Sequence, residues 1–306
     1  MADSFIIETD ELRKNYGPVE AVRGLNLQVP AGSICGFLGR NGAGKTTTIK
    51  VLLGMARPTS GHVRVFGLAA EAQQASVDIR RRTGFVSDDK DLYGYMTVEE
   101  MVRFTAAFFP RWRADLQQRY LRTFELPLDR KVKALSGGMR TKLALLLALC
   151  RGAELLILDE PTSGLDPIAR RQIHDILIAL KRRGKLILLS SHYLDEIEAL
   201  ADRVIIMSAG RIVADGTPLE LLARSAGAST LWLDVSGVDD PSRLLPQATF
   251  EGRDGAMFRY RTADPTAAIV ALADSLRASG AKLADLRLKR PSLEDVYLEL
   301  IAGGRS

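Results

Sequence analysis

Residues 39–46 read Gly-Arg-Asn-Gly-Ala-Gly-Lys-Thr, which satisfies every specified position of the phosphate-binding pattern G-x-x-x-x-G-K-[ST]. An apolar run precedes this stretch and a helix-like run follows it. Its glycines let the backbone curl around a phosphate without interference from Cβ atoms, and the following helix directs free N–H groups at the same point. In this pattern Lys45 reaches the terminal phosphates and the Thr46 hydroxyl binds Mg²⁺. The stretch therefore predicts a nucleoside triphosphate site rather than a glycine-rich turn with a chance lysine.

A second stretch, residues 155–160, reads Leu-Leu-Ile-Leu-Asp-Glu. The apolar residues predict a buried strand, and two adjacent carboxylates follow at its exposed end. Side chains alternate along a strand, so Asp159 and Glu160 are expected to differ in role. Beside a phosphate loop, the first carboxylate is expected to hold Mg²⁺ and the second to accept a proton from an attacking water. The alternative is that the pair only caps the next helix, which Pro161 and Thr162 would permit.

Two further motifs are interpreted as phosphate contacts because the phosphate loop and the Asp-Glu strand are present. His192 follows another predicted strand, in Leu-Leu-Ser-Ser-His, where an imidazole can donate a hydrogen bond to a γ-phosphate. Residues 135–139 read Leu-Ser-Gly-Gly-Met and open a long helical run, which makes a second anion cradle. One nucleotide cannot need two cradles so far apart unless the chain folds them together or two chains share their sites. His62 and His174 lack such a context and are interpreted as surface or packing residues.

The composition is that of an ordinary soluble globular protein. Its 42 basic residues are offset by 37 acidic ones, so no nucleic-acid partner is expected despite the net charge of +5. No run approaches the roughly 18 to 20 apolar residues of a membrane helix, since the strongest one, residues 143–150, ends at Arg151. Cys35 and Cys150 lie within apolar runs, which favours buried thiols in a reducing cytosol over a disulfide.

The order of the predicted elements indicates an α/β fold followed by a small α+β domain. Short apolar runs alternate with helix-period segments up to about residue 223, which is typical of a largely parallel sheet. A mostly helical stretch, about residues 88–150, is interpreted as a subdomain inserted into this core. After a small polar linker, the remaining residues predict strands and a helix in split βαβ order, closed by a terminal helix. We place the two domains at residues 1–224 and 230–306.

In order and spacing, these motifs resemble those of the ATP-binding subunits of ABC transporters. The set comprises the phosphate loop, Leu-Ser-Gly-Gly-Met, the Asp-Glu strand, Ser-Gly-Leu-Asp at residues 163–166, and His192. The resemblance covers about residues 5–223. It implies a P-loop NTPase core of the ABC ATPase type, ATP and Mg²⁺ as ligands, and two subunits that pack head to tail.

The resemblance also carries roles over to single residues within one subunit. It implies that Tyr16 stacks on adenine and that Asp159 helps to hold Mg²⁺. It further implies that Glu160 polarises the attacking water and that His192 contacts the γ-phosphate. The residues implied to wrap the phosphates are Gly39, Arg40, Asn41, Gly42, Ala43, Gly44, Lys45, Thr46 and Thr47.

Between subunits, the resemblance answers the question of the two cradles. It implies that Ser136, Gly137 and Gly138 close over ATP held by the partner chain, and that Asp166 links the two sites. The sequence departs from the family pattern at residues 83–90, which lack the glutamine that usually touches Mg²⁺ and senses the membrane partner. We assign that place, as a Mg²⁺ ligand, to Asp88, whose shorter carboxylate would orient the nucleophile differently.

We therefore expect a subunit that hydrolyses ATP to ADP and phosphate and powers an ABC transporter of the exporter type, by nucleotide-driven closure of a homodimer or heterodimer. Its expected partner is a separate transmembrane permease, and its expected location is cytoplasmic, peripheral on the inner face of the cell membrane. The helical subdomain is the expected docking surface. Its candidate apolar contacts are Tyr93, Tyr95, Phe108, Phe109 and Trp112.

The C-terminal run, residues 290–300, resembles the tail of subunits that serve exporters of drugs, antibiotics or polysaccharides. An amphipathic helix that packs on its own domain explains the same run equally well. The alternative function is a non-transport ABC-type ATPase, such as a DNA-repair or translation factor, but the sequence has neither a coiled-coil nor a zinc insertion. A simple P-loop kinase or GTPase is disfavoured by Leu-Ser-Gly-Gly-Met and by the lack of an Asn-Lys-x-Asp guanine-binding motif.

Overall fold

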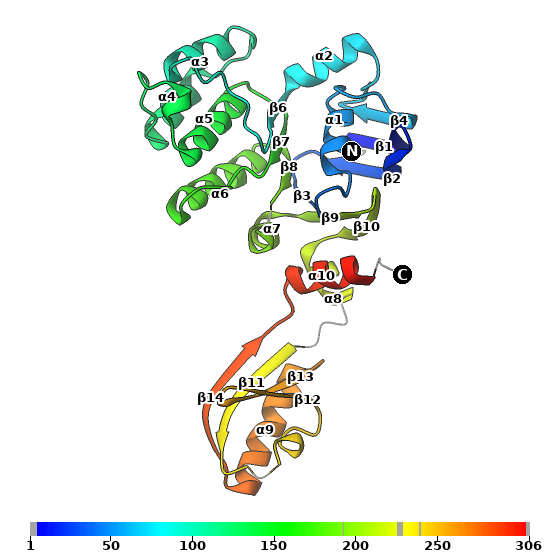
Figure 1. Cartoon of the computed structure of the whole chain (residues 1–306), viewed down its shortest axis with the longest axis vertical. Coiled ribbons are helices and arrows are strands. Elements are labelled where there is room, and N and C mark those ends of the chain that lie inside the picture. The colour runs from blue at the N-terminus through cyan, green and yellow to red at the C-terminus, as the bar shows by residue number, and fades with distance from the viewer. Residues whose placement is uncertain (1–4, 192, 225–228, 239, 304–306) are drawn as a thin grey trace. The chain divides into compact units, whose positions relative to one another are not determined.

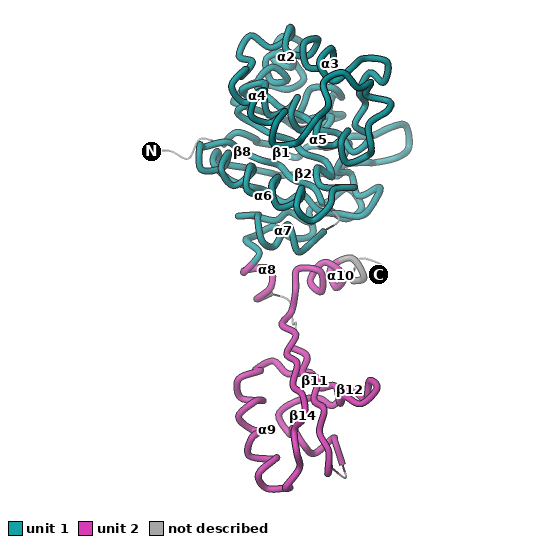
Figure 2. The backbone as a smooth tube through the Cα atoms, turned by 90° about the vertical axis from the view of Figure 1, so that its left-hand side faces the viewer, with its two compact units in different colours: residues 1–218 teal, residues 219–306 magenta. Residues whose placement is uncertain are grey.

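The computed structural model describes residues 5–191, 193–224, 229–238 and 240–303. The chain divides into two compact units, Met1–Pro218 and Leu219–Ser306 (Figure 2). Helix α8 (Pro218–Arg224) begins at this division, although the sequence analysis assigned it to the first domain.

The first unit is built around a mostly parallel sheet with the strand order β10-β9-β3-β8-β7-β6 (Figure 1). The strands are β3 (Ile34–Gly39), β6 (Thr83–Val86), β7 (Leu155–Asp159), β8 (Leu186–Ser190), β9 (Arg203–Ser208) and β10 (Arg211–Gly216). Only β10 runs antiparallel to its neighbour within this described sheet. Long apolar runs form the central strands because both faces of a parallel sheet are covered. The predicted parallel core is confirmed. The carboxyl ends of its parallel strands all lie at the same edge of the sheet.

Helices α1 (Lys45–Leu52), α6 (Pro167–Lys181) and α7 (Leu194–Leu200) follow β3, β7 and β8, and α2 (Gln73–Arg82) leads into β6. Helix α6 begins where the sequence favours it, because the Asp166 side chain accepts a hydrogen bond from Ala169 N at 2.9 Å and Pro167 occupies the first helical position.

A second, antiparallel sheet packs on the same core. Its order is β2-β1-β4-β5, with β1 (Phe5–Tyr16), β2 (Val19–Pro30), β4 (Ser60–Val65) and β5 (Leu68–Ala69). Buried residues of β1 and β2, such as Leu12 and Val22, belong to one cluster with Phe37 of the central sheet and Leu52 of α1.

The helical subdomain comprises α3 (Val98–Ala106), α4 (Ala114–Thr123), the short 3₁₀ helix η1 (Val132–Ala134) and α5 (Gly137–Leu149). A capping box starts α3: Thr97 Oγ1 accepts from Glu100 N, and the Glu100 carboxylate accepts from Thr97 N. Helix α5 is almost wholly buried from Leu143 to its end, so it forms the centre of the subdomain.

The second unit contains a sheet of order β12-β13-β11-β14 and helix α9 (Pro265–Ser279). Its strands are β11 (Ser229–Ser236), β12 (Thr249–Asp254), β13 (Met257–Thr262) and β14 (Lys282–Lys289), with η2 (Pro241–Arg243) after β11 and α10 (Leu293–Gly303) at the end. Because β11 runs antiparallel to both β13 and β14, β13-α9-β14 is a split βαβ unit. Leu231, Tyr260 and Leu272 lie in its core.

Candidate nucleotide-binding site

The phosphate loop joins β3 to α1, and its glycines are required by its backbone. Gly39, Gly42 and Gly44 have φ values of 156°, 82° and 104°. A Cβ at Gly39 would lie 2.6 Å from Met207 O, and one at Gly44 would lie 2.5 Å from Ala21 O, so a larger residue would displace main chain. Among the described residues, a Cβ at Gly42 would meet no atom within 4 Å, so this part of the loop faces open space. The loop is thus fixed on its inner side and accessible on its outer side.

Backbone hydrogen bonds hold the loop against both sheets. Gly210 N, in the turn between β9 and β10, donates to Ala43 O at 3.0 Å, and Arg23 N of β2 donates to Gly210 O at 2.8 Å. Gly44 stands at the N-cap of α1, and glycine has no side chain to accept from the first-turn amides. These amides are therefore oriented for an anion at the start of the helix, where Thr46 is exposed and Thr47 half-buried.

Lys45 extends back across the loop. Its Nζ donates to Gly39 O and, at 3.4 Å, to Arg40 O. Burial lowers the pKa of Lys45, while the carboxylates of Asp159 and Glu160 oppose that shift. A partly buried ammonium group beside two carboxylates at the loop is suited to bind a phosphate. The structure thus brings the phosphate loop and the Asp-Glu pair to one site.

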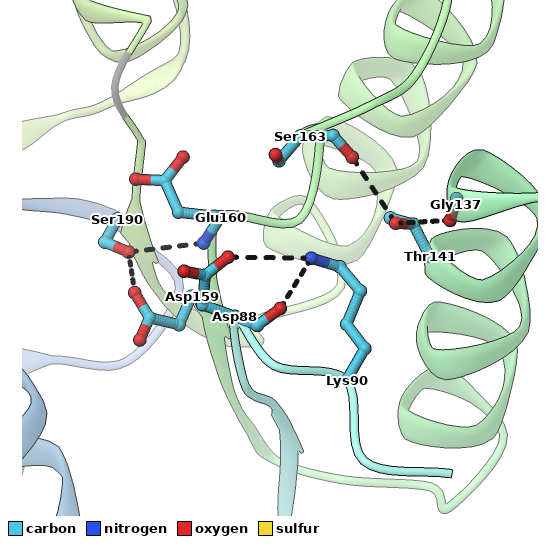
Figure 3. Close-up of polar contacts among 8 residues, drawn as sticks. All are labelled: Asp88, Lys90, Gly137, Thr141, Asp159, Glu160, Ser163 and Ser190. Atoms are coloured by element: carbon cyan, nitrogen blue, oxygen red, sulfur yellow. Dashed lines mark hydrogen bonds and ion pairs between the residues drawn. The ribbon is translucent and has the colours of Figure 1, made fainter.

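Asp159 and Glu160 leave the end of β7 in different directions (Figure 3). Ser190 Oγ, at the end of neighbouring β8, donates to Asp159, and Glu160 N donates to Ser190 O at 3.2 Å. Glu160 has a φ of 51°, a conformation that non-glycine residues rarely adopt, and is only 5% exposed. This turn explains how two adjacent carboxylates can have different surroundings. The sequence analysis missed Ser190, although its place at the end of a parallel strand was a usable signal.

Asp88 follows β6, which pairs with β7 through Val86 and Leu158, so it leaves the sheet at the same edge as Asp159. Lys90 Nζ donates to Asp88 O at 3.0 Å and lies 3.8 Å from the Asp88 carboxylate (Figure 3). The carboxylate is exposed and already has a cationic neighbour. Its assignment as a Mg²⁺ ligand stays a prediction.

The second cradle lies at the start of α5. Ser136 is the N-cap, and its Oγ accepts from Met139 N at 3.2 Å. Gly138 packs so closely on the turn after Glu160 that a Cβ there would lie 3.0 Å from Gly164 O. Thr141 Oγ1 bonds Gly137 O at 3.2 Å and Ser163 O at 3.4 Å (Figure 3). The cradle and the 163–166 turn therefore form one local assembly.

The remaining predicted residues are placed as follows. Tyr16 lies at the tip of the β1–β2 hairpin, 49% exposed, with Lys14 Nζ 4.8 Å from its ring centroid. Asp166 caps α6 within its own chain, and its pKa is lowered chiefly by the hydrogen bond from Ala169 N. His192 lies outside the described residues.

The oxygen donors at this edge suit Mg²⁺. Within the described ranges, no group of three or more His, Cys, Asp or Glu side chains is arranged to bind a metal. Mg²⁺ commonly uses one or two carboxylates together with substrate phosphates rather than an all-protein cage. The exposed Thr46 hydroxyl and the Asp159 carboxylate at the phosphate loop fit that mode.

Comparison with known proteins agrees with this geometry. Residues 22–163 match the family model described as ABC transporter. The daunorubicin/doxorubicin resistance ATP-binding protein DrrA of Streptomyces peucetius is 38% identical, over 96% of this chain and 92% of its own. This chain is an ATP-binding subunit of the ABC transporter family. ABC subunits of this kind bind nucleotide and hydrolyse ATP, so the predicted enzyme class is confirmed.

Other ABC proteins extend the comparison. The Nod factor export ATP-binding protein I of Paraburkholderia xenovorans is 36% identical over 96% of each chain. A solved ATP-binding subunit of an ABC transporter, 29% identical, superposes with a TM-score of 0.67 over 72% of this chain and 92% of that one. The dimeric cassette MJ0796, 23% identical, has the same fold, with a TM-score of 0.63 over 69% of this chain and 98% of that one.

The ABC assignment decides between the functional alternatives. The full-length relatives are transporter subunits, so the transport interpretation is supported over a DNA-repair or translation factor. Across the ranges that the structure describes, no helix combines the length and apolar character needed to cross a membrane.

Proposed function

We propose that this ABC subunit powers export, with ATP held at residues 39–47 and hydrolysed by water polarised at Glu160. The observation that carries the proposal is that the phosphate loop follows β3 while Asp159 and Glu160 lie at the end of β7 in the same parallel sheet, where both carboxylates act on the charge of Lys45. Lys45 binds the terminal phosphates as a charge-assisted donor. Glu160, held by its backbone bond to Ser190, accepts the proton of the attacking water.

The other predicted contacts complete this site. Thr46 and Asp159, with Asp88 as a further candidate ligand, would hold Mg²⁺, which would neutralise charge at the phosphates. Tyr16 stacks on adenine, and its half-exposed ring has the required accessibility. His192 contacts the γ-phosphate, and the described residues next to it, Ser191 and Tyr193, follow the strand that adjoins β7.

The second cradle acts on ATP bound by a second subunit, identical or related. The phosphate loop starts α1 in the core, whereas Ser136 starts α5 in the helical subdomain, and Figure 1 draws these helices on opposite sides of β6, β7 and β8. Head-to-tail pairing gives each nucleotide one loop and one opposing cradle. Since Gly138 packs on Gly164, closure at the cradle also moves the turn that leads to Asp166.

Ser136→Arg tests this shared site. The long cationic side chain would fill the space at the α5 N-terminus and oppose its dipole, so the dimer should not close. We expect monomeric ATP affinity within about threefold of wild type and a loss of at least about tenfold in ATPase activity, corresponding to about 1.4 kcal/mol. Nucleotide titration and phosphate release measure the two effects. Normal ATPase activity in this variant would contradict a site completed by Ser136 of the partner subunit.

The proposed membrane partner is a permease that docks on an exposed aromatic row of the helical subdomain. Tyr95, Tyr93, Phe104 and Phe108 form consecutive ring contacts with centroid distances of 5.8, 5.5 and 5.1 Å. Tyr95 and Phe108 are 67% and 61% exposed. Aromatic surfaces of this kind are typical of protein interfaces. The names of relatives that act in drug resistance and Nod factor export support export as the direction.

Two of the five predicted docking residues have other contacts. Phe109 lies under the guanidinium group of Arg151 at 4.3 Å, and Trp112 Nε1 donates to Gln117 at 2.7 Å. Phe104, which the sequence analysis did not select, takes their place in the aromatic row. The loop and helix α3 bring these rings together, which sequence spacing alone does not reveal.

The double substitution Tyr95→Ser and Phe108→Ser should separate docking from catalysis. Both rings are exposed, so the isolated subunit should hydrolyse ATP within about twofold of wild type, while capture by its permease falls at least about tenfold. Val270→Ser on α9, which removes another exposed apolar side chain, is the matched control. Co-purification with a co-expressed permease partner measures capture. Unchanged capture by the double variant would exclude the aromatic row as the docking surface.

A further inference from the structure

A buried polar cluster adjoins the turn that follows Glu160. The cluster is centred on Glu196 of α7. The Glu196 side chain is 2% exposed. Its Oε2 accepts hydrogen bonds from Thr162 Oγ1 at 2.9 Å and Ser191 Oγ at 3.2 Å. Its Oε1 lies 3.1 Å from Arg170 Nε and 3.5 Å from His174 Nε2, both on α6. One carboxylate thus joins four side chains from three separate segments.

The electrostatics of the cluster favour an ionised carboxylate. Burial alone would raise the pKa of Glu196, but His174, Thr162 and Arg170 hold it below its usual value. A charged acceptor forms stronger and more directional hydrogen bonds than a neutral one. In a buried site these bonds also resist small displacements of their donors. The hydrogen bonds to Oε2 therefore fix Thr162 relative to Ser191, whereas Oε1 faces Arg170 Nε and His174 Nε2 without a hydrogen bond to either.

Each hydroxyl bound by Glu196 lies next to the catalytic groups. Thr162 belongs to the turn after Glu160, in which Ser163 N donates to Glu160 O at 3.3 Å. Ser191 follows Ser190, whose side chain bonds Asp159 and, at 3.3 Å, Glu160 N. The ends of β7 and β8 are thus tied together twice, once at Ser190 and once through Glu196.

The backbone conformation at Glu160 requires contacts that hold it in place. A φ of 51° at a non-glycine residue is strained and persists only where its surroundings fix it. We propose that Glu196 is a positioning residue for ATP hydrolysis, because its bonds to Thr162 and Ser191 hold the turn that orients the Glu160 carboxylate. The inference rests on the proposed role of Glu160 as the base. Errors of about 1 Å in such a group can reduce rates about a hundredfold.

The cluster also connects this turn to α6. Arg170 and His174 lie on the helix that Asp166 caps, and the Arg170 guanidinium stacks on the Tyr193 ring at 4.0 Å. The sequence analysis interpreted His174 as a surface or packing residue. In the structure its Nε2 lies 3.5 Å from Glu196 Oε1, so it packs as part of this polar cluster.

The sharpest test compares Thr162→Val with Thr162→Ser. Valine keeps the shape of this buried side chain and removes only the hydroxyl bond to Glu196, whereas serine keeps the bond. We expect kcat to fall at least about tenfold in the valine variant, with the KM for ATP within about threefold, and the serine variant to recover most of the loss. Asp195→Asn, an exposed acidic position on the same helix, is the control for lost charge.

Glu196→Gln supplies the second measurement, with thermal unfolding recorded because the partly buried Arg170 guanidinium loses its counter-charge. We expect kcat to fall at least as far as in Thr162→Val, and the combined variant to be no slower than Glu196→Gln alone, since both changes break one connection. A Thr162→Val enzyme that turns over within about twofold of wild type would overturn the inference, as would a serine variant as slow as the valine variant. Multiplying effects in the combined variant would also overturn it. If Glu160→Gln is inactive while Thr162→Val is fully active, the function stands and only the positioning role fails.

Discussion

ATP hydrolysis is expected to fall at least about a hundredfold when Glu160 is replaced by glutamine, while ATP binding persists. The amide keeps the size and the polar contacts of the side chain but cannot accept the proton of the attacking water. The Glu160 side chain is only 5% exposed, and an amide of the same size fits the same space. The backbone hydrogen bond from Glu160 N to Ser190 O does not involve the side chain, so the variant should fold. Because ATP binds but is not consumed, the closed dimer should accumulate.

Phosphate release under steady-state conditions measures the first effect, and size-exclusion chromatography with ATP and Mg²⁺ measures the second. Glu99→Gln, an exposed position in the first turn of α3, makes the same chemical change in the helical subdomain and should turn over like wild type. Wild-type hydrolysis by Glu160→Gln would show that another group activates the water.

Lys45→Ala should weaken ATP binding by about 10- to 100-fold, because charge-assisted hydrogen bonds to phosphate contribute roughly 1.5–3 kcal/mol. The Lys45 ammonium group lies on the loop and donates to Gly39 O, and the carboxylates of Asp159 and Glu160 act on its charge. Without it the two carboxylates would also repel the triphosphate. Titration with a fluorescent ATP analogue measures the affinity.

Lys50→Ala is the matched control for Lys45→Ala. Lys50 is an exposed lysine in the last turn of the same helix, so its loss removes an equal charge outside the loop. Its ATP affinity should stay within about twofold of wild type. If Lys45→Ala bound ATP as tightly as this control, residues 39–47 would not be the phosphate site.

Much of the fold was predictable because its strands are marked by local pattern. The runs at β3, β7 and β8 are apolar on both faces, and each is bounded by polar or glycine residues, so sequence alone located them. Strand β1 was missed because its pairing with β2 shifts register between Thr9 and Leu12, around Glu11 at a φ of 45°. Such a bulge breaks the alternation by which a strand is recognised.

The phosphate loop was predictable for a physical reason of the same kind. Gly39 and Gly44, the two glycines that the pattern specifies, stand where a Cβ would strike the main chain of Met207 or Ala21, so the backbone itself requires the pattern. The role proposed for Glu196 was not predictable, because it depends on bonds to Thr162 and Ser191 that only folding brings together.

The central claim is that ATP is held between the loop of one subunit and the α5 start of another. The most direct test is a structure of Glu160→Gln determined with ATP and Mg²⁺. The account predicts a dimer in which one γ-phosphate contacts Lys45 of one subunit and Ser136 of the partner subunit. A nucleotide bound away from residues 39–47, or a dimer that leaves Ser136 of the partner subunit remote from every γ-phosphate, would contradict it.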